Sequence, residues 1–218
     1  MNTAGLIRAG LLVVPVGGAL KLLGDIGTFD SIGYGIAQPA EAATVTSNSF
    51  VLGELVGSIV PTLLAPFGVL ALFFLLLPYG HCRTLTAALI CAVLGAGATL
   101  PGLGVINFAV PALGQAYREG WAGAMTIVDS FLTWPRGAML YPAVLFPLGV
   151  ILFAVVLWRA RPVPRAATLL FAVSAVLTVI DEWKLSGYVA GFAGLVGMMF
   201  LRYWFRRNGV RAPVERQA

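Results

Sequence analysis

The sequence predicts an all-α membrane protein, a bundle of six transmembrane helices in a single domain. Hydrophobic residues make up 59% of the chain and charged residues only 11%, whereas soluble domains carry about 25% charged residues. Six apolar segments come close to the roughly 20 residues that cross a bilayer. Basic residues also collect on alternate connections between these segments, which is typical of multi-pass proteins.

The predicted spans, in chain order, cover residues 6–23, 50–77, 85–113, 138–158, 164–183 and 185–204, and a basic tail follows at 205–218. The first span has a basic start like a signal peptide, but no small-residue cleavage site follows it closely, so we expect a retained helix. The third span is too long for one straight helix. Because Pro101 lacks an N–H, we expect a kink near residues 99–102, with residues 101–114 either continuing the helix or forming a separate segment.

The distribution of charge predicts both termini in the cytoplasm. Four basic residues then lie outside, namely Lys21, Arg118, Arg136 and Lys184. The other ten lie inside, namely Arg8, Arg83, Arg159, Arg161, Arg165, Arg202, Arg206, Arg207, Arg211 and Arg216. This is the bias expected of cytoplasmic loops. The net charge of +5 therefore indicates contact with the lipid bilayer and its anionic headgroups on the cytoplasmic face, and not binding of nucleic acid.

Two stretches share a spaced pattern, PTLLAPFGV at 61–69 and PAVLFPLGV at 142–150. They predict a parallel duplication of a helical hairpin, with spans two and three repeated as spans four and five. The alternative is that two proline-rich helices converged. Prolines free carbonyl groups that need partners inside the protein, so we expect them to bend their helices toward a shared interior. The helix-bending candidates are Pro61, Pro66, Pro101, Pro142 and Pro147.

Glycines recur at helical spacing in two of the spans. Gly53 and Gly57 open the second span, and Gly187 and Gly191 lead a run that continues to Gly197 in the sixth. Small residues at this spacing let helix backbones approach closely. The run in the sixth span predicts either packing within the chain or a dimerisation face.

Polar side chains near membrane depth gather toward the outer ends of the spans. Ionisable groups in such positions are costly, so they are functional candidates by default. The alternative is a set of solvated helix ends. The predicted polar cleft consists of Lys21, Asp25, Glu54, Asn107, Asp181 and Glu182.

Most membrane chemistries lack the residues they would need. The only histidine is His81, so a bis-histidine haem site cannot form within one chain. His81 and Cys82 supply too few ligands for zinc. Cys91 falls inside the third span, away from the oxidising side where disulfides form. We therefore expect no metal, no cofactor and no catalytic residues, and the chain is not predicted to be an enzyme.

Two apolar motifs carry a family resemblance: GATLPGLGVINFAVPAL at 97–113, and YPAVLFPLGV at 141–150 followed by the arginines at 159–165. In these motifs the chain resembles a broad group of uncharacterised small multi-spanning bacterial membrane proteins of actinobacterial type. That group has no assigned function, so the resemblance implies a multi-pass fold in the bacterial plasma membrane and no site.

Two function hypotheses follow from the sequence. The first is a small transport-related or ligand-sensing bundle with an outward-facing polar cleft, and the polar residues favour it. The second is a non-catalytic accessory protein that packs against a membrane partner or forms a homo-oligomer, and the glycine faces favour it.

Overall fold

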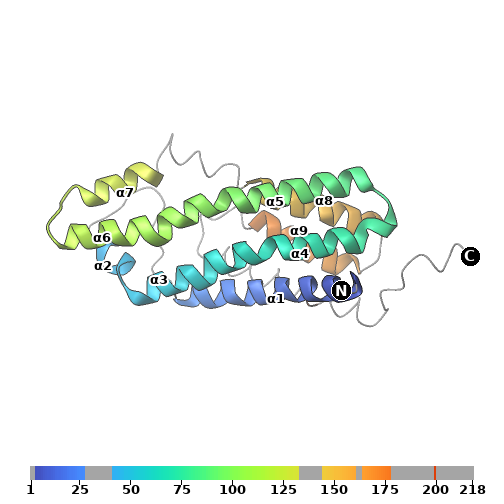
Figure 1. Ribbon diagram of the computed structural model, residues 1–218, viewed down its shortest axis with the longest axis horizontal. Helices are drawn as coiled ribbons and strands as arrows, with labels where there is room; N and C mark the ends of the chain where they lie inside the picture. The colour runs from blue at the N-terminus through green and yellow to red at the C-terminus, as the bar shows by residue number, and fades with distance from the viewer. Residues whose placement is uncertain (1–2, 28–40, 133–143, 161–163, 178–198, 200–218) are drawn as a thin grey trace, which may run out of the picture.

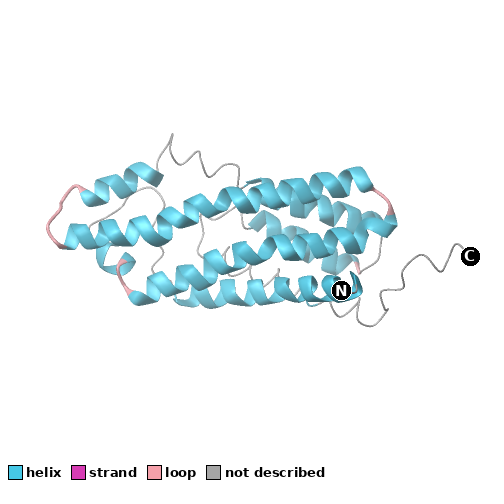
Figure 2. Ribbon diagram, in the orientation of Figure 1, coloured by secondary structure: helices cyan, strands magenta, loops and turns pink. Residues whose placement is uncertain are grey.

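The computed structural model describes residues 3–27, 41–132, 144–160, 164–177 and 199, and these residues form helices and connecting turns without any strand (Figures 1 and 2). The all-α prediction is confirmed over these ranges. The elements in chain order are α1 Thr3–Gly27, α2 Glu41–Val45, α3 Asn48–Glu54, π-helical η1 Leu55–Ile59, α4 Val60–Leu76, 3₁₀-helical η2 Leu77–Tyr79, α5 Cys82–Gly104, π-helical η3 Val105–Ala109, α6 Val110–Arg118, α7 Ala124–Leu132, α8 Leu145–Ala160 and α9 Arg165–Leu177.

Two continuous helical rods dominate the described part of the chain. The first runs over Asn48–Tyr79 with 32 residues, and the second over Cys82–Arg118 with 37 residues. Both are long and apolar enough to cross a membrane. At 1.5 Å per residue they measure about 48 and 56 Å, well beyond the roughly 30 Å of a hydrocarbon core. Each rod is therefore long enough to extend past a bilayer at one end.

The predicted spans match these helices unevenly. The second and third predicted spans fall within the two rods, and the first falls within α1. Parts of the fourth and fifth predicted spans are described, as α8 and α9. The sixth lies outside the described residues except for Met199.

The α5 helix is not interrupted at Pro101, and the kink expected near residues 99–102 stays a prediction. The α5 helix stays α-helical through Pro101 to Gly104, and the irregular turn comes later, at Val105–Ala109. Residues 101–114 thus continue the third helix. A proline removes one hydrogen bond from a helix without ending it when the neighbouring bonds hold.

Helix α1 lies antiparallel to the first rod, and three of its glycines spaced seven residues apart, Gly10, Gly17 and Gly24, face that rod (Figure 1). An added Cβ would clash at Gly10 and Gly24, whereas at Gly17 it would lie at an ordinary contact distance of 3.8 Å from Pro61. A Cβ atom added at Gly57 would lie 2.7 Å from the Cα of Gly24, so the two backbones touch. The residues that these three glycines face are, in order, Ala71, Pro61 and Gly57. The Gly53–Gly57 pair thus serves packing within the chain, whereas the Gly187–Gly197 run lies outside the described residues.

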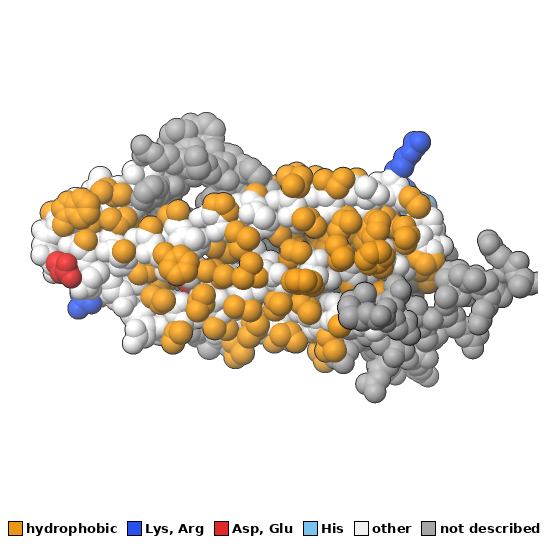
Figure 3. All heavy atoms as spheres, viewed as in Figure 1, with side chains coloured by type: hydrophobic (Ala, Val, Ile, Leu, Met, Phe, Trp, Pro, Cys, Tyr) orange, Lys and Arg blue, Asp and Glu red, His pale blue; other side chains and the backbone are white. Residues whose placement is uncertain are grey.

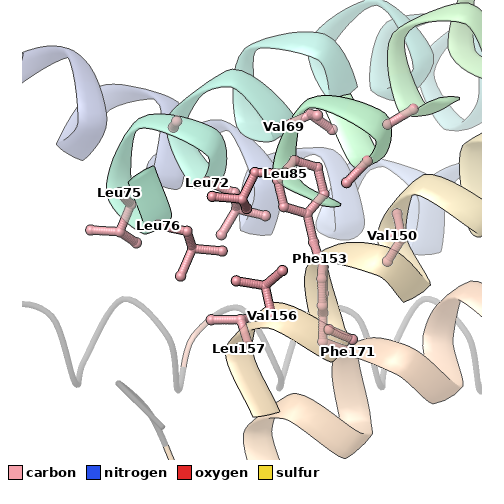
Figure 4. Close-up of a cluster of buried hydrophobic side chains, with 14 of the residues drawn as sticks. Val69, Leu72, Leu75, Leu76, Leu85, Val150, Phe153, Val156, Leu157 and Phe171 are labelled. Carbon is pink, nitrogen blue, oxygen red and sulfur yellow. The ribbon is translucent and has the colours of Figure 1, made fainter. Parts of the chain in front are cut away.

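A second close contact joins α5 and α8. A Cβ added at Gly149 would lie 2.7 Å from the carbonyl oxygen of Ala88, and Gly95 faces the backbone of Phe146 in the same way. These pairings make the two helices antiparallel. Together with α1, α4 and α9 they enclose the first core, a wholly apolar cluster near the α4–α5 turn whose largest members include Leu72, Leu76, Leu85, Phe153 and Leu157 (Figure 4).

The opposite end of the bundle holds a smaller second core, where α2, α7 and the end of the second rod lie together (Figure 1). Its buried residues are Ala42, Val45, Phe50, Val110, Met125 and Val128. It covers the parts of both rods that exceed the length of a membrane span.

The two halves of the predicted repeat occupy similar environments. Gly68 and Val69 are buried in α4, and Gly149 and Val150 are buried in α8. Val69 and Val150 both belong to the first core. The duplication of the whole hairpin remains a prediction.

Candidate functional site

Each rod contains one widened turn, and each widened turn is followed by the same dipeptide. Val60-Pro61 follows η1, and Val110-Pro111 follows η3. In both places the valine amide donates to the carbonyl five residues back, that of Leu55 or Val105. A proline ring clashes with the carbonyl four residues before it, and one extra residue in the turn relieves that clash.

The widened turns leave two backbone carbonyls without their helical donors. The carbonyl of Val56 would normally accept from the amide of Val60, but that amide donates to Leu55. The next residue along is Pro61, which has no N–H. The carbonyl of Ile106 loses its donor in the same way, because Val110 donates to Val105 and Pro111 follows.

These two carbonyls lie at nearly the same height in the bundle. The rods form an antiparallel hairpin around the turn at Gly80–His81, and η1 packs against α5. Val56 lies 24 residues before Gly80, and Ile106 lies 25 residues after His81. At 1.5 Å per residue both are about 36 Å from the turn. We call this slice of the bundle, which holds η1 and η3, the π level.

Glu54 and Ser58 form a hydrogen-bonded pair across η1. The Oγ of Ser58 donates to Oε2 of Glu54 at 2.8 Å, and both side chains are half-buried. The next hydroxyl, that of Thr62, donates to the carbonyl oxygen of Ser58 at 2.7 Å. Sequence reasoning missed this role of Ser58. The signal was its spacing of four residues from Glu54, which places both on one helix face.

Asn107 is the most deeply buried polar side chain of the π level, at 3% exposed. Its Nδ2 donates to the carbonyl oxygen of Leu103 at 2.9 Å. Its Oδ1 is buried and has no hydrogen-bond partner. A buried polar atom left unpaired costs about 1–3 kcal/mol, so an unpaired amide oxygen requires an explanation.

Three of the six predicted cleft residues lie at a similar height in the bundle, and their gathering in one cleft stays a prediction. Lys21 lies one turn before Gly24, on the face of α1 that contacts η1. Phe50 and Val110 share the second core. Glu54 lies one turn after Phe50, and Asn107 lies one turn before Val110. Because the rods are antiparallel, both steps lead in the same direction along the bundle, so Glu54 and Asn107 lie at the same height.

The other candidates are not brought into this arrangement by the described residues. Asp25 belongs to α1, one turn beyond Lys21, but its side chain lies outside the description. Asp181 and Glu182 also lie outside the described residues.

The candidate helix-bending prolines differ in effect. Pro61 follows a widened turn, whereas Pro66 and Pro101 sit in α-helix that continues through them. Pro147 lies in the first turn of α8, where a missing N–H removes no helical bond. Pro142 lies outside the described residues. Pro111 follows the second widened turn, and sequence reasoning overlooked it; the repeated Val-Pro dipeptide was the available signal.

Charged and apolar side chains separate along the bundle. No Asp, Glu, Lys or Arg occurs between Glu54 and Arg83, or between Arg83 and Arg118. Figure 3 shows hydrophobic side chains over the middle of the described surface and charged ones toward its two ends. Many large apolar side chains of the middle are exposed, including Leu63, Phe67, Leu94 and Phe108. Near the α4–α5 end, the Arg165 guanidinium lies 5.2 Å from the Trp158 ring centre.

Comparison of the chain with protein-family models, with curated proteins and with solved structures finds no match to any of them.

Proposed function

We propose that this chain is a multi-pass protein of the bacterial plasma membrane, with six helices and both termini in the cytoplasm. In this proposal its π level forms an outward-facing polar cleft that serves transport or ligand sensing. Support for the membrane location comes from the two long apolar rods and the exposed apolar side chains between charged ends. A soluble protein rarely exposes so much contiguous apolar surface.

The observation that carries the cleft is the buried, unpaired Oδ1 of Asn107. It lies at the same height as Glu54 and Lys21. Along the two rods, this height is about 24 to 26 residues from the α4–α5 turn. A membrane span of about 20 residues that starts near that turn ends close to this height. A ligand from the outer aqueous phase would therefore meet the polar groups without crossing the hydrocarbon core.

A double-mutant cycle on Glu54→Gln and Asn107→Leu tests the shared cleft. Contacting or ligand-sharing residues couple by more than about 0.5 kcal/mol, whereas independent helix ends behave additively. The measurement is the thermal stability of the full chain in lipid nanodiscs. The matched control pairs Asn107→Leu with Glu119→Gln, because Glu119 is exposed beyond the π level. Additivity in both cycles would refute the cleft.

The orientation of the bundle has its own test. Cys82 is exposed at the α4–α5 turn, which the proposal assigns to the cytoplasm, and Glu119 lies at the opposite end. In a Cys91→Ser background, an impermeant thiol reagent added to whole cells should not label Cys82. It should label the Glu119→Cys, Cys82→Ser variant. The reverse result would invert the topology.

A second candidate function is that of an accessory membrane partner, and one surface favours it. One face of α5 and η3 carries residues that are alternately four and three positions apart, the spacing of a coiled-coil seam. On this stripe, bulky exposed side chains lie on either side of two glycines. Added Cβ atoms at Gly97 and Gly104 would meet nothing within 4 Å. The stripe consists of Ile90, Leu94, Gly97, Pro101, Gly104 and Phe108. Disulfide or chemical cross-linking through Gly97→Cys in native membranes would capture such a partner.

A further inference from the structure

Exposed arginines gather at the α4–α5 end of the bundle. Arg83 lies two residues before Leu85, at the start of α5, and Arg159 lies two residues after Leu157, near the end of α8. Because Leu85 and Leu157 share the first core, both arginines lie at this end. Arg165, the first residue of α9, joins them through its contact with the end of α8.

The acidic residues that the structure describes lie elsewhere. They belong to the π level or to the helices around the second core. They are Asp25, Glu41, Glu54, Glu119 and Asp129. Within the described ranges, the end that holds the three arginines therefore carries positive charge without a balancing carboxylate.

Arg165 is held in a defined position by an aromatic ring. Its guanidinium carbon lies 5.2 Å from the centre of the Trp158 ring, within the range of a cation–π contact. No hydrogen bond joins its N–H groups to any described residue. A guanidinium with free N–H groups can bind two oxygens of one phosphate at the same time, which a lysine ammonium cannot do with the same geometry.

An apolar strip follows Arg165 along the same face of α9. Leu169 and Val173 come four and eight residues later, and residues four apart lie one above the other on a helix. Leu169 is 53% exposed and Val173 is 45% exposed. Because α9 runs from the α4–α5 end into the first core, the strip extends about 12 Å toward the middle of the bundle. A cationic group above an exposed apolar strip matches the two parts of a phospholipid.

We propose that this end of the bundle holds a binding site for one anionic phospholipid, formed by Trp158, Arg165, Leu169 and Val173. The headgroup phosphate lies on Arg165, and an acyl chain lies along the strip. The other two arginines of this end favour a headgroup of net negative charge over a zwitterionic one. The proposal rests on the membrane location in the proposed function and is independent of the polar cleft at the opposite end.

A free phosphate ion could also bind Arg165, and the experiment separates it from a lipid. The full chain is purified in a neutral detergent and titrated with phosphatidylglycerol, or with phosphatidylcholine that has the same acyl chains. Native mass spectrometry measures the bound lipid. We expect phosphatidylglycerol to bind more tightly. An excess of inorganic phosphate should not displace it, because a phosphate ion makes no contact with the apolar strip.

Matched variants assign the binding to this site. Arg165→Ala should weaken phosphatidylglycerol binding about fivefold, the factor expected for one arginine near an anionic headgroup. Arg165→Lys keeps the charge but loses the paired N–H groups, so it should also weaken binding, and it serves as the second variant if Arg165→Ala does not fold. Leu169→Ser should weaken the binding of both lipids. The control is Arg118→Ala, which removes an exposed arginine at the opposite end that donates to Thr46, and it should bind lipid as the wild type does.

Several results would overturn the proposal. These are equal affinity for the two lipids, equal losses in Arg165→Ala and Arg118→Ala, and displacement of the lipid by inorganic phosphate. Unchanged binding in Arg165→Lys would also overturn it, because general surface charge would then account for the preference. The labelling of Cys82 and the cycle on Glu54 and Asn107 test the orientation and the cleft separately, so a failure there leaves the lipid preference to be judged on its own.

Discussion

The two ends of the rods bury side chains equally well but differ in helix geometry. Near the α4–α5 turn, Leu85 and Phe153 are fully buried in an apolar core, and Thr168, one turn before Phe171 of that core, is buried with an unpaired Oγ1. About 36 Å away along the rods, Asn107 is almost as buried, and its Oδ1 is likewise unpaired. The helices around the first core are regular, whereas both π-turns occur at the far end.

This difference indicates which end of the bundle specifies the fold and which end is available for function. An apolar core of regular helices gains stability from every contact it makes. Widened turns reduce stability, and proteins keep them mainly at functional sites. The first core is therefore expected to contribute more to the stability of the bundle than the π level does.

The largest expected effect is on the first core. Phe153→Ala should lower the free energy of unfolding by about 3–5 kcal/mol, because it leaves a cavity among closely packed side chains. The matched change at the exposed end is Phe108→Ala, where the side chain is 67% exposed. Chemical denaturation in mixed micelles measures both. Equal losses would contradict the division between the two ends.

The α5–α8 contact should be nearly as sensitive. Gly95→Ala places a methyl group against the backbone of Phe146, and overpacking of this kind costs about 1–3 kcal/mol. Gly97→Ala is the control on the same helix, since nothing lies within 4 Å of its added Cβ. That variant should be neutral or stabilising by up to about 1 kcal/mol. Similar stabilities for both variants would show that the two helices are less tightly packed than described.

A smaller effect is expected from restoring an amide at the π level. Pro111→Ala supplies the N–H that η3 lacks and should let the turn return to α-helical geometry, raising stability by about 1 kcal/mol. Differential scanning of the wild type and of the variant measures the change in stability.

The smallest expected effect sharpens the comparison further. Asn107→Leu should be neutral or stabilising by about 1 kcal/mol, because it removes the unpaired buried oxygen while losing one local hydrogen bond. A loss above about 2 kcal/mol, measured by chemical denaturation, would indicate that Oδ1 has a partner that stabilises the folded state.

Hydropathy predicted the all-α class and, in particular, α1 and the two rods, because long apolar segments allow few alternatives. It did not locate the irregular turns. The effect of Pro101 and of Pro111 depends on which neighbouring amides can move to another carbonyl, and the residue type does not encode that. The polar residues Lys21, Glu54 and Asn107 were predictable because few polar groups interrupt the apolar runs. Their shared height was not, because the contacts of Gly24 and of the second core set it.

The seven-residue spacing of Gly10, Gly17 and Gly24 has a mechanical consequence. Gly10 and Gly24 let the backbone of α1 approach its neighbour closely, and Gly17 lies opposite Pro61 at ordinary contact distance. A shift of one or two residues would bring larger side chains to both close points. The next matching position is seven residues, or about 10 Å, away. Helix α1 is therefore expected to keep its register against the first rod and not to slide along it.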